Sequence, residues 1–165
     1  MTSESAELPA RDFAPDELDT WSAVATLLEW MPAALDAQLQ RDAGLSHFEF
    51  GILYALARAE DGVLRMSELA GYANSTLSRL SRAVARLERP GWVRREVDPS
   101  DGRVTLARIT AEGRRAQQAA APGHVDLVRR VVFGSLTPAQ ARALGESSRR
   151  ITSALRADGA WRPAP

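Results

Sequence analysis

The 165-residue sequence has no cysteine, and this absence excludes disulfide bonds, thiolate metal ligands, cysteine nucleophiles and thiol redox sensing. Lysine is absent as well, so all 21 basic residues are arginine and a P-loop, which needs its lysine, is excluded. No apolar run approaches the roughly 18 uncharged residues of a membrane span, and the acidic, polar N-terminus does not resemble a signal peptide. We therefore expect a cytoplasmic protein that does not interact with membranes.

The sequence also lacks the motifs of common enzyme sites. Its two histidines, His47 and His124, are far apart and do not have the spacing of a zinc motif. A serine-nucleophile elbow and a glycine-rich dinucleotide loop are both missing, and Asp98 and Asp101 fall in an expected turn rather than in a cleft. We therefore predict a protein that is not an enzyme, with no catalytic residues, no metal site and no cofactor.

The net charge of zero hides an uneven distribution along the chain. Residues 1–42 hold two arginines and nine acids, whereas residues 75–115 hold ten arginines and five acids. The last fifty residues are also basic, with seven arginines and three acids. Because a polyanion responds to the local field, this basic middle is compatible with nucleic-acid binding despite the neutral total.

Helical periodicity begins after a leader, residues 1–15, that we expect to be disordered. One apolar stripe at spacings of three and four predicts a helix over residues 16–44; its members are Leu18, Trp21, Val24, Leu28, Met31, Leu35 and Leu39. Pro32 should kink or divide this helix, and Gly44 should end it. At the other end of the chain, residues 158–165 are expected to form a frayed tail.

The central segment, residues 45–110, predicts three helices and a hairpin. Ser46 and Glu49 form a capping box that opens the first helix, which is followed by a short strand over residues 63–66. Ser67 is expected to cap a short helix that runs to about residue 73, and Thr76 a longer one that runs to about residue 89, with a tight turn at Asn74 between them. Strands over residues 92–97 and 104–109 complete a winged helix-turn-helix, so the fold class is mainly α with a small β-wing.

The helix after Thr76 has the composition of a DNA-recognition helix. Its apolar side is expected to consist of Leu77, Leu80, Val84 and Leu87. Its polar side carries Thr76, Ser78, Arg79, Ser81, Arg82 and Arg86. A helix of this kind fits the major groove, where arginine binds guanine or phosphate. In the hairpin turn, Arg103 could enter the minor groove and Asp101 could hold it in a fixed pose.

These residues resemble the MarR family of bacterial transcriptional regulators. The matching stretch is LRMSELAGYANSTLSRLSRAVARLERPGWVRREVDPSDGRVTLARITAEG, Leu64 to Gly113, including a D-P-x-D-x-R wing and an A-x-I-T-x-x-G entry to a long helix. The capped helices on both sides extend the likeness over roughly residues 18–156. The resemblance implies a homodimer in which each protomer places a recognition helix and a wing on a palindromic site in double-stranded DNA.

Residue roles follow from the resemblance by position. Ser78, Arg79, Ser81 and Arg82 would face the major groove, Arg86 and Arg94 would lie nearer the DNA backbone, and Arg103 would enter the minor groove. Two positions depart from the family's pattern: Ala85 stands where an acid is common, and Gly102 where a first wing arginine is common. These departures imply a missing ion pair near Arg86 and a more flexible wing.

Two C-terminal helices are expected within residues 111–157. Pro122 and Gly123 should interrupt the first, and Thr137 followed by Pro138 should open the second. A small winged helix cannot bury the apolar stripes of three further helices, so residues 16–44 and 111–157 are predicted to form a dimer interface. A self-contained monomeric bundle is the alternative.

The resemblance also implies a site for a small-molecule effector, because the family often binds phenolic or other aromatic acids. The candidate residues on the first two helices are Trp21, Trp30, Met31, His47, Phe50 and Tyr54. The simpler interpretation makes them core and interface residues, with His47 a helix-start residue rather than a pH sensor.

The leading hypothesis is a dimeric repressor that a small aromatic or phenolic ligand releases from DNA. A DNA-binding regulator without a ligand, and a winged helix that binds a protein partner instead of DNA, remain as alternatives. The sequence identifies neither the operator nor the effector.

Overall fold

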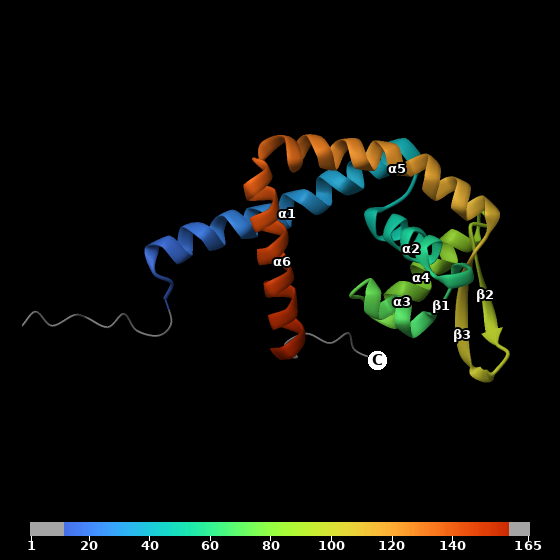
Figure 1. The fold of residues 1–165 in the computed structure, drawn as a ribbon. Coiled ribbons are helices and arrows are strands. Elements are labelled where there is room, and N and C mark those ends of the chain that lie inside the picture. The colour runs from blue at the N-terminus through green and yellow to red at the C-terminus, as the bar shows by residue number, and fades with distance from the viewer. Residues whose placement is uncertain (1–11, 159–165) are drawn as a thin grey trace, which may run out of the picture. The chain divides into compact units, whose positions relative to one another are not determined.

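The computed structural model describes residues 12–158, so most of the predicted leader and all but the first residue of the predicted tail lie outside the described residues. Its elements in chain order are α1 (Pro15–Ala43), α2 (His47–Arg58), η1 (Glu60–Gly62), β1 (Val63–Arg65), α3 (Met66–Tyr72), α4 (Leu77–Glu88), β2 (Val93–Asp98), β3 (Asp101–Ile109), α5 (Ala111–Val131), η2 (Phe133–Ser135) and α6 (Pro138–Asp158) (Figure 1). The chain divides after Ala34 into two compact units, which are described separately. The predicted fold class, mainly α with a small three-stranded sheet, is confirmed.

The first unit consists of the N-terminal part of α1, up to Ala34. The helix continues through Pro32, so the expected division at this residue does not occur. Further along, α1 ends at Ala43, and Gly44 adopts a left-handed φ of 65° that permits the chain to turn there, as predicted. Among the described residues, no helix is both long and apolar enough to cross a membrane.

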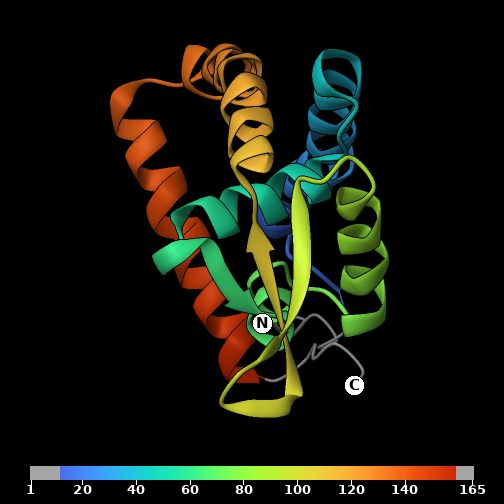
Figure 2. The ribbon, with the colours of Figure 1, turned by 90° about the vertical axis from the view of Figure 1, so that its right-hand side faces the viewer.

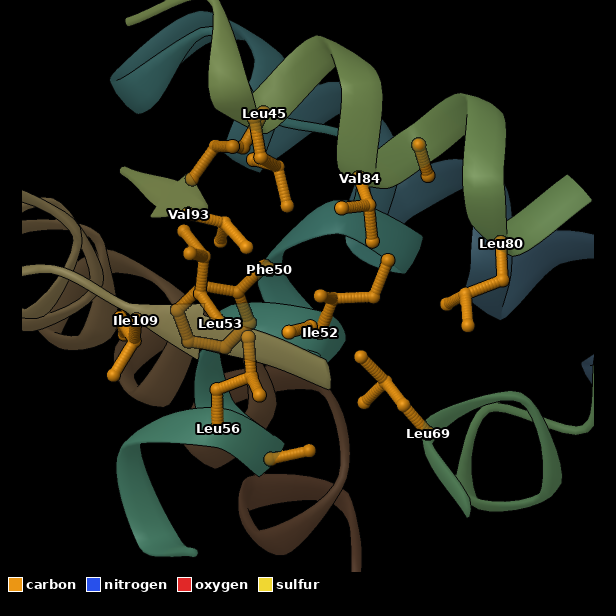
Figure 3. Packing of buried hydrophobic residues seen from close by; sticks show 14 of the residues in the cluster. Leu45, Phe50, Ile52, Leu53, Leu56, Leu69, Leu80, Val84, Val93 and Ile109 are labelled. Atoms are coloured by element: carbon orange, nitrogen blue, oxygen red, sulfur yellow. The ribbon is translucent and has the colours of Figure 1, made fainter. Parts of the chain in front are cut away.

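The second unit contains a winged helix built on one hydrophobic core. Antiparallel strands in the order β1-β3-β2 form its sheet, with Val63 opposite Arg108 and Val93 opposite Ile109. Figure 2 shows that the β2–β3 hairpin turns at the first residues of β3, whereas α5 begins after the other end of this strand. Leu80 and Val84 of α4 point toward Ile52 of α2 (Figure 3), and all three are fully buried. This core holds α4 in a fixed orientation relative to α2 and the sheet.

The helix-turn-helix connection follows the predicted turn chemistry. Asn74 has a φ of 47°, and the hydroxyl oxygen of Thr76 accepts a hydrogen bond from the backbone N–H of Arg79 at 3.2 Å. The predicted start of α3 is wrong. That helix begins at Met66, directly after β1, and the backbone N–H of Arg65 donates to the Glu68 carboxylate, so Ser67 does not cap it. Burial of the Met66 side chain anchors the first turn two residues earlier than the capping signal indicated.

Two further expectations fail because tertiary packing outweighs local signals. Leu77 is 45% exposed, and Ala83 instead joins Leu80, Val84 and Leu87 on the buried side of α4. In α5 the helix is continuous through Pro122 and Gly123 rather than interrupted. A Cβ on Gly123 would lie 2.9 Å from both Gln38 Nε2 and Asp42 Oδ2, so the glycine permits the close approach of α5 to the last turns of α1.

Candidate nucleic-acid interface

Helix α4 presents four distinct surfaces because successive residues are about 100° apart around a helix axis. Its buried side faces the core through Leu80, Val84 and Leu87. The opposite side carries Ser78, Arg82, Ala85 and Arg89, of which all but the half-buried Ala85 are exposed. The two flanks between these sides are occupied by residues that contact other elements of the unit.

The flank toward α2 carries two of the predicted DNA-binding arginines. The Arg79 guanidinium lies over the Phe48 ring, 4.5 Å from its centroid. Two helical turns further along α4, Arg86 Nε donates a hydrogen bond to the Glu49 carboxylate and forms an ion pair with it. The ion pair that Ala85 cannot make is thus replaced by one from α2, which fixes Arg86 against the first turn of that helix.

Glu49 connects this flank to the capping box of α2. Its carboxylate accepts hydrogen bonds from the backbone N–H and the hydroxyl of Ser46, both at 2.9 Å, in addition to the Arg86 contact. Burial raises the pKa of Glu49, but the hydrogen bonds from Ser46 and Arg86 outweigh it and leave the pKa below its usual value. Glu49 therefore remains ionised and keeps α2, α4 and Arg86 together.

The opposite flank carries Ser81 and Glu88, which both contact Arg95 of β2. Arg95 binds the Glu88 carboxylate through two nitrogens, Nε at 3.2 Å and NH2 at 2.6 Å, and its NH1 donates to Ser81 Oγ at 3.3 Å. The hydrogen bond from Arg95 lowers the pKa of Glu88. Sequence reasoning missed Arg95, although its place in the strand next to the wing could have indicated it. This contact fixes the wing relative to α4.

The wing places Arg103 at its tip. The Arg103 side chain is 92% exposed, and the Asp101 carboxylate accepts hydrogen bonds from its Nε and NH2 at 3.1 and 3.2 Å. The Arg103 hydrogen bond lowers the pKa of Asp101. Arg94 is also exposed and pairs with Glu96 at 2.7 Å. The structure thus shows the Asp101–Arg103 contact that the sequence analysis expected.

Three of the six candidate effector residues lie together between α2 and α5. His47, Phe50 and Tyr54 line an open pocket of about 710 Å³, together with residues of α3, α5 and η2. The rings of His47 and His124 stack with centroids 5.7 Å apart, and the Nδ1 atoms of both are buried without a hydrogen-bond partner in the structure. The other three candidates, Trp21, Trp30 and Met31, belong to the first unit and are not part of this lining. Within residues 12–158, no three acidic or histidine side chains come together as a metal site.

Comparisons with known proteins identify the family of this fold. The sequence model of the MarR family matches residues 43–104. The structure of Sco3205 from Streptomyces coelicolor, a MarR family transcriptional regulator in complex with DNA, is 47% identical with a TM-score of 0.85, over 90% of this chain and 92% of that one. AbsC, a MarR family regulator from the same organism, is 31% identical with a TM-score of 0.84, over 89% and 99%.

A curated relative extends the comparison to a second organism. The uncharacterised HTH-type transcriptional regulator YxaD of Bacillus subtilis is 38% identical over 85 residues. The matched region spans 52% of this chain and 58% of YxaD, so it covers little more than half of that relative.

Proposed function

Because the chain belongs to the MarR family of DNA-binding transcriptional regulators, we propose that it is a homodimeric repressor that a small, largely apolar ligand releases from a palindromic operator. The observation that carries the ligand step is the pocket between α2 and α5. A pocket of about 710 Å³ is large enough for a small aromatic molecule, and its apolar walls with a few polar groups are typical of ligand sites.

In this proposal the outward side of α4 enters the major groove. Ser78 and Arg82 on this side would face base edges, Thr76, Arg79 and Ser81 would lie at its borders, Arg86 and Arg94 would lie nearer the backbone, and Arg103 would enter the minor groove. The contact of Arg95 with Glu88 and Ser81 supports it, because this contact fixes the distance between the major-groove helix and the wing. Asp101 would reduce the freedom of Arg103 before DNA binds.

Dimerisation would bury the apolar side chains that α6 leaves exposed. Leu144, Ile151 and Leu155 are 40–58% exposed, and their spacing of seven and four residues places them on one side of the helix. No side chain of residues 138–157 is buried within the chain. An exposed apolar surface of this kind is typical of an interface, and a second copy of the chain would cover it in a two-fold dimer.

The pocket would couple ligand binding to DNA release because its two walls belong to different parts of the protein. One wall is α2, which packs against α4, and the other is α5, which leads from the wing toward α6. A ligand that separates α2 from α5 would favour a dimer whose two recognition helices no longer match the operator spacing.

The test is a titration of fluorescent duplexes by anisotropy at two salt concentrations, with the DNA that flanks the protein's own gene and a scrambled duplex as control. We expect selective, salt-dependent binding that aromatic carboxylates or phenols reverse. Gly51 lines the pocket and has no atom within 4 Å of its Cβ position, so Gly51→Trp should fill the pocket without a backbone clash. This variant should bind DNA normally and ignore the ligand.

Each outcome decides one part of the proposal. A wild-type protein that shows no selectivity for any genomic fragment would remove the DNA-binding role. Selective binding that no member of the ligand panel alters would favour a regulator without a ligand. A Gly51→Trp variant that still responds to the ligand would place the effector elsewhere.

A further inference from the structure

We propose that a hollow between α2 and α4 holds a phosphate of the DNA backbone, and that Arg79 is a phosphate contact rather than a base-reading residue. The hollow has a volume of about 340 Å³, and its lining consists of Asp36, Ser46, Phe48, Arg79, Arg82 and Arg86. All of these residues belong to the second unit. The inference rests on the proposed DNA binding through α4 and assigns a role to a site beside it.

The position of Arg79 around the helix axis is the first argument. At about 100° per residue, Arg79 and Arg86 are only about 20° apart, whereas Arg82 lies about 60° from Arg79 toward the outward side of the helix. A helix about 10–12 Å across fills a major groove about 12 Å wide, so the flanks of the helix face the two phosphate backbones. Arg82 is therefore placed for base edges and Arg79 for phosphate.

The contact with Phe48 is the second argument. The ring of Phe48 covers one face of the Arg79 guanidinium, at 4.5 Å from centroid to Cζ, and holds the side chain against α2. A guanidinium that stacks on a ring keeps its N–H groups available in its own plane, where a phosphate can accept two of them. Base reading would require Arg79 to leave this contact and extend along the outward side of α4.

The balance of charge in the hollow is the third argument. Both acids near it are engaged by protein donors, because Asp36 accepts the backbone N–H of His47 at 2.6 Å and Glu49 binds Ser46 and Arg86. Arg79 and Arg82 have no ion-pair partner among the residues that the structure describes. The backbone N–H does not cancel the charge of Asp36, but Arg79, Arg82 and Arg86 outnumber the two acids, Asp36 and Glu49. The hollow therefore carries a net positive charge, which favours a singly charged phosphodiester over a neutral base edge.

The experiment compares Arg79→Ala with Arg82→Ala on the operator and on a scrambled duplex, each at several salt concentrations. Arg79→Ala should weaken binding to both duplexes by the same factor, about tenfold, and reduce the slope of log K against log salt by about one. Arg82→Ala should instead lower the ratio of operator to scrambled affinity. Arg150→Ala on α6, which removes an exposed arginine that pairs with Glu146, is the control and should change neither quantity.

Variants of Phe48 separate the orientation of Arg79 from its charge. Phe48→Tyr keeps a ring under the guanidinium and should bind like the wild type, whereas Phe48→Leu should lose part of the affinity that Arg79→Ala loses, on both duplexes. Circular dichroism and melting of each variant would show whether it is folded. In the double variant with Arg79→Ala, Phe48→Leu should have little further effect on binding.

Two results would overturn the inference while leaving DNA binding intact. A loss on the operator alone after Arg79→Ala would make Arg79 a base-reading residue, and unchanged affinity on both duplexes would mean that the hollow does not face DNA. A wild-type protein that binds neither duplex at low salt would overturn the proposed function together with this inference.

Discussion

Gly113 lies where the wing meets α5, and replacing it by alanine should destabilise the protein although alanine is the better helix former. The hydroxyl oxygen of Thr110 accepts the backbone N–H of Gly113 at 3.0 Å, and the hydroxyl of Thr110 donates to the carbonyl oxygen of Gly91 at 2.7 Å. The backbone N–H of Thr110 donates to the carbonyl oxygen of Trp92 at 3.0 Å. These bonds fix the start of α5 against the chain that enters β2.

The magnitude follows from the space around Gly113. A Cβ at this position would lie 2.1 Å from the carbonyl oxygen of Trp92 and 2.9 Å from Ile109 Cγ1. The oxygen belongs to the backbone, so relief requires the helix start to move by about 1 Å, at an overpacking cost of about 1–3 kcal/mol. Weakening the two bonds of the Thr110 hydroxyl, with Gly113 and with Gly91, adds about 1 kcal/mol for each, while the helix propensity of alanine returns about 1 kcal/mol. We expect a net loss of about 2–4 kcal/mol.

Urea denaturation at a fixed protein concentration measures this loss, since the stability of the proposed dimer would depend on concentration. Gly51→Ala is the matched control: Gly51 lies within α2, no atom lies within 4 Å of its Cβ position, and the substitution should stabilise by about 0.5–1 kcal/mol. A Gly113→Ala protein as stable as the wild type would refute the reasoning, because the junction would then be able to move without cost.

Three further predictions concern the wing, the pH dependence and the dimer. Arg103→Ala should weaken operator binding by about 1–3 kcal/mol in anisotropy titrations and leave the dimer intact; unchanged affinity would mean that the wing does not contact DNA. The pKa of Glu49 is lower in the folded protein, so its contribution to stability is complete above its usual pKa of 4.5 and is lost as pH falls through the folded value. Glu49→Gln should therefore show a smaller loss of stability between pH 7 and pH 3 in urea titrations than the wild type, and equal losses would contradict the assigned ion pair. Ile151→Asp should shift the protein from dimer to monomer in light scattering after size exclusion, whereas an unchanged mass would exclude this side of α6 from the interface.

The elements that could be predicted from the sequence are those whose signals are local. The capping box joins residues 46 and 49, the cap at Thr76 reaches Arg79, and the left-handed turn depends on Asn74 alone. Each of these interactions lies within three residues, so the residue types and their spacing specify it. The winged-helix order follows from them, and the structure and its relatives confirm it.

The parts that could not be predicted depend on contacts between distant residues. Glu49 and Arg86 are 37 positions apart, and neither the cap signal at one end nor the arginine at the other indicates that they pair. The continuity of α5 through Pro122 and the close approach of Gly123 to α1 are likewise features that no local rule contains. In the pocket between α2 and α5, sequence reasoning found the residues of α2 but missed His124 and the other residues of α5.

The distribution of charge shows the same limit in the proposed DNA interface. Counting ten arginines against five acids predicts a basic surface over residues 75–115, but Glu88 and Asp101 each hold one arginine through two nitrogens. Such two-point contacts use the planar guanidinium, and a lysine could not reproduce them. These contacts hold Arg95 at the flank of α4 and Arg103 at the wing tip in fixed positions. On α4, Arg79 and Arg82 have no ion-pair partner among the described residues, and two such arginines suit a helix that lies between two phosphate backbones.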